Sequence, residues 1–289
     1  MARTSEDSLI RLLDDPDPLV YRSVEKKILD LGPAMLPHLE EALKRTMNRE
    51  AHQRMESIVR ILQFEQVKND LKEWLEGPRL DLLTGTWLIE RYQFPDVSLD
   101  QYKARLKPLR DEIWLEINDQ LTALEKVRII NTILFERHDI GLNNQHPESP
   151  GNNFISRILE TGRANESSLT LLYSLICQEL HLPVFVVRIP DYPILTWLNL
   201  PVLPANPINP SLFDSLFYIN PANQGTVHSQ NDITDYLMRK AIPIEPIFYM
   251  PAGNADFLRI CLERLAMDYE AAGSNKRMEE IHRLLALWK

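Results

Sequence analysis

Apolar residues at helical spacing dominate the first 76 positions of the chain. One stripe recurs every three or four residues and consists of Val20, Val24, Ile28 and Leu31. Asp17-Pro18 precedes it with an N-cap and a proline suited to the first helical turn. Gly32-Pro33 follows it, and glycine favours the left-handed conformation that ends a helix. The pattern therefore predicts short helices joined at proline corners.

The run at positions 12–22, where Asp-Pro-Asp-Pro separates two helical stretches, resembles a HEAT-type helical repeat. One and a half such units cannot bury their own apolar stripes, so we expect this block to dock on the rest of the chain or on a partner. It is either a binding surface or a helical cap without a binding role. Gly77-Pro78 marks a boundary, and we assign residues 1–78 to this HEAT-like region.

Helices and short strands alternate beyond this boundary. Capping boxes at Ser98 with Gln101 and at Thr122 with Glu125 predict two helix starts, and Asn165 is expected to cap a third helix. Residues 138–153 have the composition of a polar loop.

Proline then changes the pattern, because eight of the 20 prolines lie between Pro183 and Pro221 and exclude long helices there. Runs at 184–189 and 216–220 are predicted as strands. Helical spacing returns after Pro251, and Gly273-Ser274-Asn275 is expected to join two helices into an αα-hairpin. We therefore predict an α+β protein. It would have helices at 1–78, a core at 79–250 with a small antiparallel sheet packed on helices, and the hairpin at 251–289.

Length and composition narrow the class. A chain of 289 residues suits two domains, and 44% hydrophobic with 25% charged residues is typical of a globular protein. Two cysteines far apart favour a reducing compartment. The polar start at residues 1–7 does not resemble a signal peptide, and no apolar run approaches the ~20 residues of a membrane span. We expect a cytoplasmic protein without a membrane partner.

The charges argue against a nucleic-acid partner. The net charge is −9, which repels phosphate backbones. The basic cluster of the N-terminal helices is interleaved with glutamates, and the two sets are Arg45, Arg49, Arg54, Arg60 and Glu40, Glu41, Glu50, Glu56. This interleaving indicates a solvated, salt-bridged helix face.

Motifs for metals and phosphates are missing from the sequence. The seven histidines form no His-Glu-x-x-His pair, paired Cys-x-x-Cys motifs do not occur, and the nine glycines form no phosphate-binding loop. We expect neither a metal nor another cofactor. Cys177 near a helix C-terminus and Cys261 on an apolar stripe are expected to be core residues rather than nucleophiles.

An ordered series of motifs carries the most information. Residues 163–173 (RANESSLTLLY) are similar to R-G-N-P-I-S-L-A-x-L-Y, and residues 182–187 match L-P-V-x-x-V. Residues 190–196 and 218–225 stand where P-G-H-F-L-V-R and F-I-D-P-F-N-G-G would follow. In this order, over roughly residues 80–289, the chain resembles the bacterial SirB family. That family has a transglutaminase-like core of the papain-like superfamily, followed by tetratricopeptide-type helices.

The resemblance also shows where this chain departs from active enzymes. Active transglutaminase-like enzymes use a cysteine at a helix N-terminus, a histidine on the next strand and an aspartate on the strand after it. The matching positions hold Glu166 (or Ser167 after a shift of one), Tyr192 and Asn220. We therefore expect a non-catalytic platform that binds a protein or peptide in a cleft lined by Asn165 and these three residues.

One enzymatic alternative stays open. A hydrolase or acyl transferase could use Ser167 or Ser168 as a substitute nucleophile, with backbone amides of the helix start as an oxyanion hole. Such an enzyme needs a base, and His181 and His228 are the nearest histidines along the chain.

Overall fold

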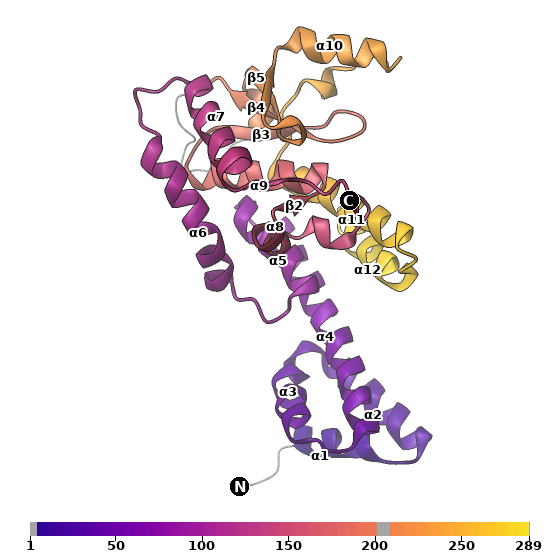
Figure 1. Ribbon diagram of the computed structural model, residues 1–289. Helices are drawn as coiled ribbons and strands as arrows, with labels where there is room; N and C mark the ends of the chain where they lie inside the picture. Colours follow the sequence, from indigo (N-terminus) through magenta and orange to yellow (C-terminus); the bar gives the residue numbers. More distant parts are fainter. Residues whose placement is uncertain (1–4, 201–208, 289) are drawn as a thin grey trace. The chain divides into compact units, whose positions relative to one another are not determined.

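The chain divides into two structural units, which the computed structural model describes over residues 5–200 and 209–288 (Figure 1). Unit 1 comprises the chain up to Glu73 together with Arg91–Pro95, and unit 2 comprises Trp74–Glu90 and the chain from Asp96 onward. Two of the three divisions fall inside helices, α4 (Arg49–Glu76) and α5 (Leu82–Gln93), and the third follows Pro95.

Unit 1 is helical. Besides the first part of α4, it contains α1 (Ser5–Arg11), η1 (Leu12–Asp14), α2 (Pro18–Leu31), η2 (Gly32–Met35) and α3 (Leu36–Arg45). The side chain of Asp17 accepts the Leu19 N–H at 2.8 Å, and Gly32 ends α2 with a φ of 74°. Both caps confirm the predicted boundaries of this helix. Its apolar stripe joins a core in which Leu13, Ile28, Leu39 and Ile58 are inaccessible to solvent.

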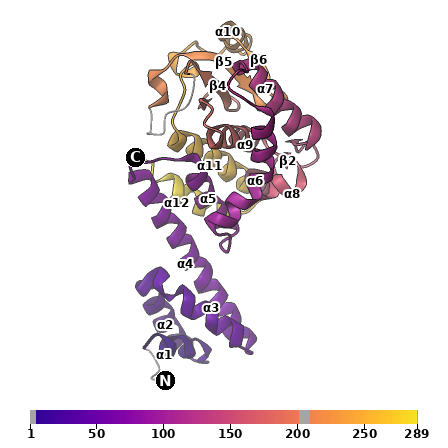
Figure 2. The ribbon, with the colours of Figure 1, turned by 90° about the vertical axis from the view of Figure 1, so that its left-hand side faces the viewer.

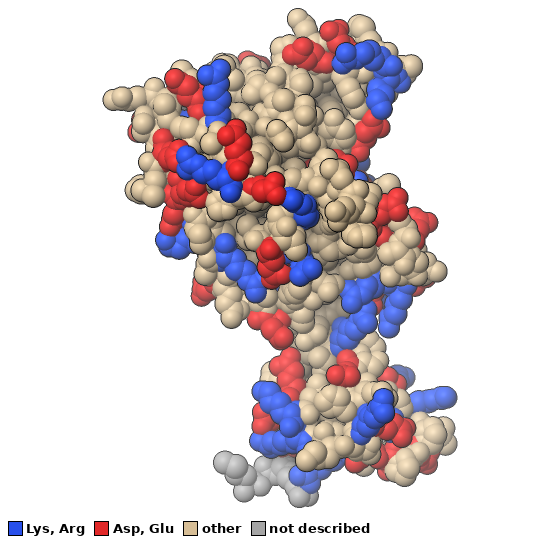
Figure 3. Space-filling view, viewed as in Figure 1, with Lys and Arg blue, Asp and Glu red and all other residues tan. Residues whose placement is uncertain are grey.

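Charged residues of unit 1 pair along the helices. Glu41 and Arg45 form an ion pair, and Glu50 and Arg54 form another at 2.6 Å. The Arg54 guanidinium also donates to the carbonyl oxygen of Leu13 at 3.1 Å, and this hydrogen bond links α4 to η1. Across the face shown in Figure 3, basic and acidic side chains are interspersed.

Unit 2 contains a series of helices around a small sheet. Its helical elements after α5 are α6 (Leu99–Glu116), α7 (Ala123–Asn131), the π-helical turn η3 (Thr132–Arg137), η4 (Pro150–Asn153), α8 (Ile155–Thr161), α9 (Glu166–Glu179), η5 (Pro210–Leu212), η6 (Pro221–Asn223), α10 (Gln230–Arg239), η7 (Pro246–Phe248), α11 (Asn254–Ala271) and α12 (Asn275–Leu285). Capping boxes at Ser98 and Thr122 start α6 and α7 as predicted, and α11 and α12 form the predicted hairpin. None of the described helices is long and apolar enough to cross a membrane.

The sheet is an antiparallel meander in the order β3-β4-β5-β6, formed by β3 (Val184–Val187), β4 (Ile194–Leu198), β5 (Ser215–Asn220) and β6 (Thr226–His228). A separate parallel pair joins β1 (Gly141–Leu142) to β2 (Arg163–Ala164). The α+β class is therefore confirmed.

Helix α9 lies at the centre of unit 2, and residues 167–177 are all buried. It contacts β3 and β4 on one side and α6 and α11 on others, as Figures 1 and 2 show. Such continuous burial fits the sequence of this stretch, which has apolar, serine and threonine side chains but no charged one.

Several elements of unit 2 were not predicted, among them the helices α5, α8 and α10 and the strands β2, β4 and β6. Residues 138–153 are also not simply a polar loop, because they include β1 and η4. Strand β4 has five buried residues between β3 and β5, so its conformation is stabilised by hydrogen bonds from both neighbours. The predicted strand at 184–189 ends at Val187.

Candidate functional site

The start of α9 is held by a capping box. The Asn165 side chain accepts the Ser168 N–H at 2.9 Å, and the Ser168 hydroxyl accepts the Asn165 N–H at 3.1 Å. This hydroxyl also donates to the carbonyl oxygen of Asn152 at 2.5 Å. The predicted cap at Asn165 is confirmed. Ser168 both accepts from and donates to the main chain, so its hydroxyl stabilises the start of the helix.

The two candidate bases for a serine enzyme lie elsewhere. His181 is exposed and follows the C-terminal end of the 14-residue helix α9, about 20 Å along the axis from its start. His228 belongs to β6, and its Nε2 lies 3.1 Å from the Thr226 hydroxyl. Ser167 is buried, with 5% of its surface exposed.

A network of hydrogen bonds around the buried carboxylate of Asp268 lies next to the start of α9. Asp268 of α11 is 2% exposed, and its Oδ2 accepts from the side-chain amides of Asn153 at 2.7 Å and Asn165 at 3.2 Å. Arg264 Nε donates to the other oxygen, Oδ1, at 2.9 Å. Burial raises the pKa of Asp268 above its ordinary value, while the bonds from Asn153 and Arg264 act in the opposite direction. Through Asn165, the N-cap residue of α9, these hydrogen bonds connect α11 to the start of α9.

Arg264 also binds Glu166, the residue at the position matched to the nucleophile. Its Nη1 donates to Glu166 Oε2 at 2.9 Å, so one guanidinium bridges Glu166 and Asp268. Asn165 is 2% exposed and its amide donates to Asp268, and Glu166 forms its ion pair with Arg264 of α11.

Tyr192 and Asn220 do come together. The Asn220 amide at the end of β5 donates to the Tyr192 hydroxyl at 3.4 Å, although 28 positions separate the two residues. Asn220 Oδ1 is buried and has no hydrogen-bond partner in the described part of the chain. Both residues line a cavity of about 330 Å³ between the sheet and α10, whose walls include Ile189, Ile194, Ile233, His228 and Tyr236. We call it the Tyr192 cavity.

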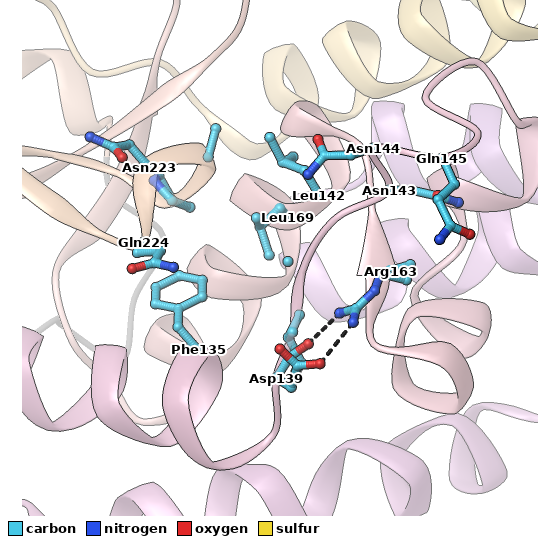
Figure 4. Close-up of a pocket in the computed structure, with 14 residues that line it drawn as sticks. Phe135, Asp139, Leu142, Asn143, Asn144, Gln145, Arg163, Leu169, Asn223 and Gln224 are labelled. Carbon is cyan, nitrogen blue, oxygen red and sulfur yellow. Dashed lines mark hydrogen bonds and ion pairs between the residues drawn. The ribbon is translucent and has the colours of Figure 1, made fainter.

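Figure 4 shows a second cavity, of about 520 Å³. It is lined by Phe135, the segment 139–145, Arg163, Leu169 of α9 and residues 221–224. Asn223 lines both cavities. We call it the Gln224 cavity after one of its lining residues.

The cysteines take no part in either cavity. Cys177 and Cys261 are free thiols and both are buried, as predicted. Burial raises the pKa of each thiol well above its ordinary value, which opposes formation of the reactive thiolate. Among the described residues there is also no cluster of three or more side chains suited to a metal ion.

Residues 100–263, more than half of the sequence, match the transglutaminase-like superfamily. The chain belongs to the transglutaminase-like superfamily. No curated protein and no solved structure matches it. The matched region runs from α6 into α11, so this superfamily member has α9, the sheet and both cavities inside the shared domain.

Sequence reasoning missed the partners of Glu166 in this transglutaminase-like domain. Arg264 follows directly after the matched region, and Asp268 lies four residues further on. This spacing puts an opposite-charge pair on one helix face, which is usually a solvated arrangement. The burial of Asp268 distinguishes this pair from a solvated surface pair, and the sequence gives no sign that a single charged residue is buried.

Proposed function

We propose that this transglutaminase-like protein is non-catalytic and binds a peptide segment of a protein partner in the Tyr192 cavity. The observation that carries the proposal is the pairing at the three positions matched to the triad. Glu166 is bound by Arg264, whereas Tyr192 and Asn220 are bonded to each other. The proposal includes membership of the bacterial SirB family, on the order of motifs described above.

Each of the three groups is unsuited to its matched role. A carboxylate held by a guanidinium has no thiolate-like nucleophilicity toward a peptide carbonyl. A phenol is a poor general base at neutral pH, and without an imidazole at position 192 the side chain of Asn220 has no catalytic base to orient. The engagement of the Ser168 hydroxyl with the main chain also argues against Ser168 as a substitute nucleophile.

The Tyr192 cavity has the features of a binding site. Its volume of about 330 Å³ lies in the range of ligand pockets, about 300–1,000 Å³. The isoleucines Ile189, Ile194 and Ile233 offer apolar walls. Asn220 Oδ1 is a buried acceptor without a partner, and such an atom is costly unless a donor reaches it. A peptide supplies both an apolar side chain and an N–H donor.

Panning a random peptide library against the whole chain tests the binding function. Enriched peptides would be synthesised, and their dissociation constants measured for the wild type and for Asn220→Leu, which has no acceptor. We expect the substitution to weaken binding about tenfold, as expected for one buried hydrogen bond and the fit around it. Asn231→Leu, at an exposed position on α10 that does not line the cavity, is the matched control.

A second experiment tests the absence of catalysis. The native protein would be treated with a fluorophosphonate and with a thiol-directed acyl probe, followed by mass spectrometry of its peptides. We expect no labelling of Ser167, Ser168 or either cysteine. Labelling of a serine that Ser168→Ala abolishes, or cleavage of an enriched peptide, would contradict the proposal.

A further inference from the structure

The Gln224 cavity has a neutral lining. Its charged residues are Asp139 and Arg163, and these bind each other, with Arg163 Nη2 2.7 Å from Asp139 Oδ2 (Figure 4). Arg163 Nη1 also donates to the Asp139 carbonyl oxygen at 2.5 Å. Since the pair satisfies itself, the cavity has no unpaired charge with which to attract an ion.

Residues with side-chain amides lie on different sides of this cavity. Asn144 and Gln145 lie at one side and Gln224 at the other, with Leu169 between them (Figure 4). In the described part of the chain, the amides of Asn144, Gln145 and Gln224 have no hydrogen-bond partner, and all three residues are exposed. Leu169 is 2% exposed and forms an apolar floor. The cavity therefore combines unused donors and acceptors with an apolar base.

Hydrogen bonds to the neighbouring residues Asn143 and Gly225 hold the segments that carry these amides in place. The Asn131 side chain donates to the Gly225 carbonyl oxygen at 2.9 Å, and Tyr173 donates to Asn131 at 3.0 Å. On the opposite side, the Asn143 amide donates to Asn152 Oδ1 at 2.9 Å. Rigid walls lower the entropy lost when a ligand binds.

Strained backbone is found at the same place. Asp139 and Gln224 have φ values of 48° and 50°, a region that residues other than glycine rarely adopt. Such strain persists where the surrounding structure enforces it, and it is frequent at ligand sites.

Strand β1 adds main-chain groups to the cavity wall. The N–H groups of Gly141 and Asn143 donate to the carbonyl oxygens of Gly162 and Ala164, at 2.9 Å and 2.8 Å. By the alternation of a parallel pair, the Leu142 N–H points to the opposite edge of β1. Leu142 itself lines the cavity.

We propose that the Gln224 cavity binds an extended, uncharged peptide segment by its main chain. A carboxamide presents a C=O and an N–H side by side, and these match the N–H and C=O of one extended residue. Amides on two sides and a strand edge between them therefore suit a chain of peptide groups better than a charged ligand. The inference rests on the proposed binding function and adds the second site that the partner's main chain would occupy.

The test uses acetylated, amidated tetrapeptides of uncharged residues, titrated into the full chain by calorimetry. The double variant Asn144→Ala/Gln145→Ala removes two side-chain amides that form no hydrogen bonds within the described part of the chain. Gln230→Ala/Asn231→Ala makes the same change at exposed positions outside both cavities. We expect the first variant to weaken binding about tenfold and the second to leave it unchanged, because each lost hydrogen bond contributes about 0.5–1.5 kcal/mol, and 1.4 kcal/mol is a factor of about ten.

The other outcomes separate this inference from the proposed function. If Asn220→Leu abolishes tetrapeptide binding and Asn144→Ala/Gln145→Ala does not, the inference is overturned and binding in the Tyr192 cavity stands. Failure of every tetrapeptide to bind at 1 mM overturns the inference, while the longer panned peptides decide the proposed function separately. Tighter binding of tetrapeptides with a central lysine or glutamate, or of maltotriose, also overturns it.

Discussion

Glu90 gives a prediction in which a single buried carboxyl group makes the stability of unit 2 depend on pH. The residue is 1% exposed, and its Oε1 accepts the Ser156 N–H at 3.1 Å at the start of α8. Its other oxygen, Oε2, has no partner among the described residues. Burial raises the pKa of Glu90 from 4.5 to about 7, although the Ser156 bonds and Arg105 act in the opposite direction.

The sign follows from proton linkage. The folded chain binds this proton more tightly than the unfolded chain, so the stabilisation is complete below pH 4.5 and is lost as pH rises through about 7. A difference of about 2.5 pKa units corresponds to about 3 kcal/mol, of which about 2.5 kcal/mol is lost between pH 5 and pH 8.5. Glu90→Gln keeps the shape and the acceptor for Ser156 but cannot ionise. The difference in the free energy of unfolding between Glu90→Gln and the wild type is therefore expected to shift by about 2.5 kcal/mol in favour of the variant when the pH rises from 5 to 8.5.

Guanidinium unfolding followed by tryptophan fluorescence measures this difference. All five tryptophans lie in unit 2, so the signal reports on the unit that contains Glu90. The free energy of unfolding would be compared for wild type and Glu90→Gln at pH 5 and pH 8.5, with Glu148→Gln in an exposed loop as control. Equal changes with pH in the wild type and in Glu90→Gln would refute the reasoning.

Three further predictions concern packing and reactivity. Arg264→Met leaves two carboxylates without their shared cation, and we expect a loss of about 3 kcal/mol in the free energy of unfolding at pH 7, measured by the same fluorescence assay. Gly225 and Gly273 both have a positive φ, 71° and 68°, so alanine is strained at either position. A Cβ at position 225 would also lie 2.0 Å from Asn131 Oδ1, whereas a Cβ at position 273 would have no atom within 4 Å. Chemical denaturation should show a loss of about 2 kcal/mol or more for Gly225→Ala and about 1 kcal/mol for Gly273→Ala, and equal losses would count against this account of the contact. Cys177 and Cys261 should react with Ellman's reagent only after unfolding, since burial raises the pKa of both thiols; rapid reaction of the native protein would contradict this.

The helix boundaries were determined mainly by the sequence. Asp17, Ser98 and Asn165 cap helices where they were predicted to, because a cap joins a side chain to a backbone group two or three residues away. The overall class followed in the same way, since the spacing of apolar residues shows which segments form helices or strands. The order of local motifs also indicated the superfamily.

The elements that depend on neighbours were decided by tertiary structure. Strand β4 lies between two strands that hydrogen-bond to it, and β6 and α10 likewise complete the edge of the sheet and its covering. Their short segments carry little preference of their own, because β-propensity reflects the environment of a strand more than its residues.

The same distinction holds within the candidate site. Resemblance placed Tyr192 near Asn220, and the fold does bring them together. It could not show that Glu166 would be bound by Arg264, 98 positions away, because that ion pair depends on the docking of α11 against α9. The residue types at the site were determined by the sequence, whereas tertiary packing decided which of them meet, since contacts between distant segments arise only when helices bury their apolar faces together.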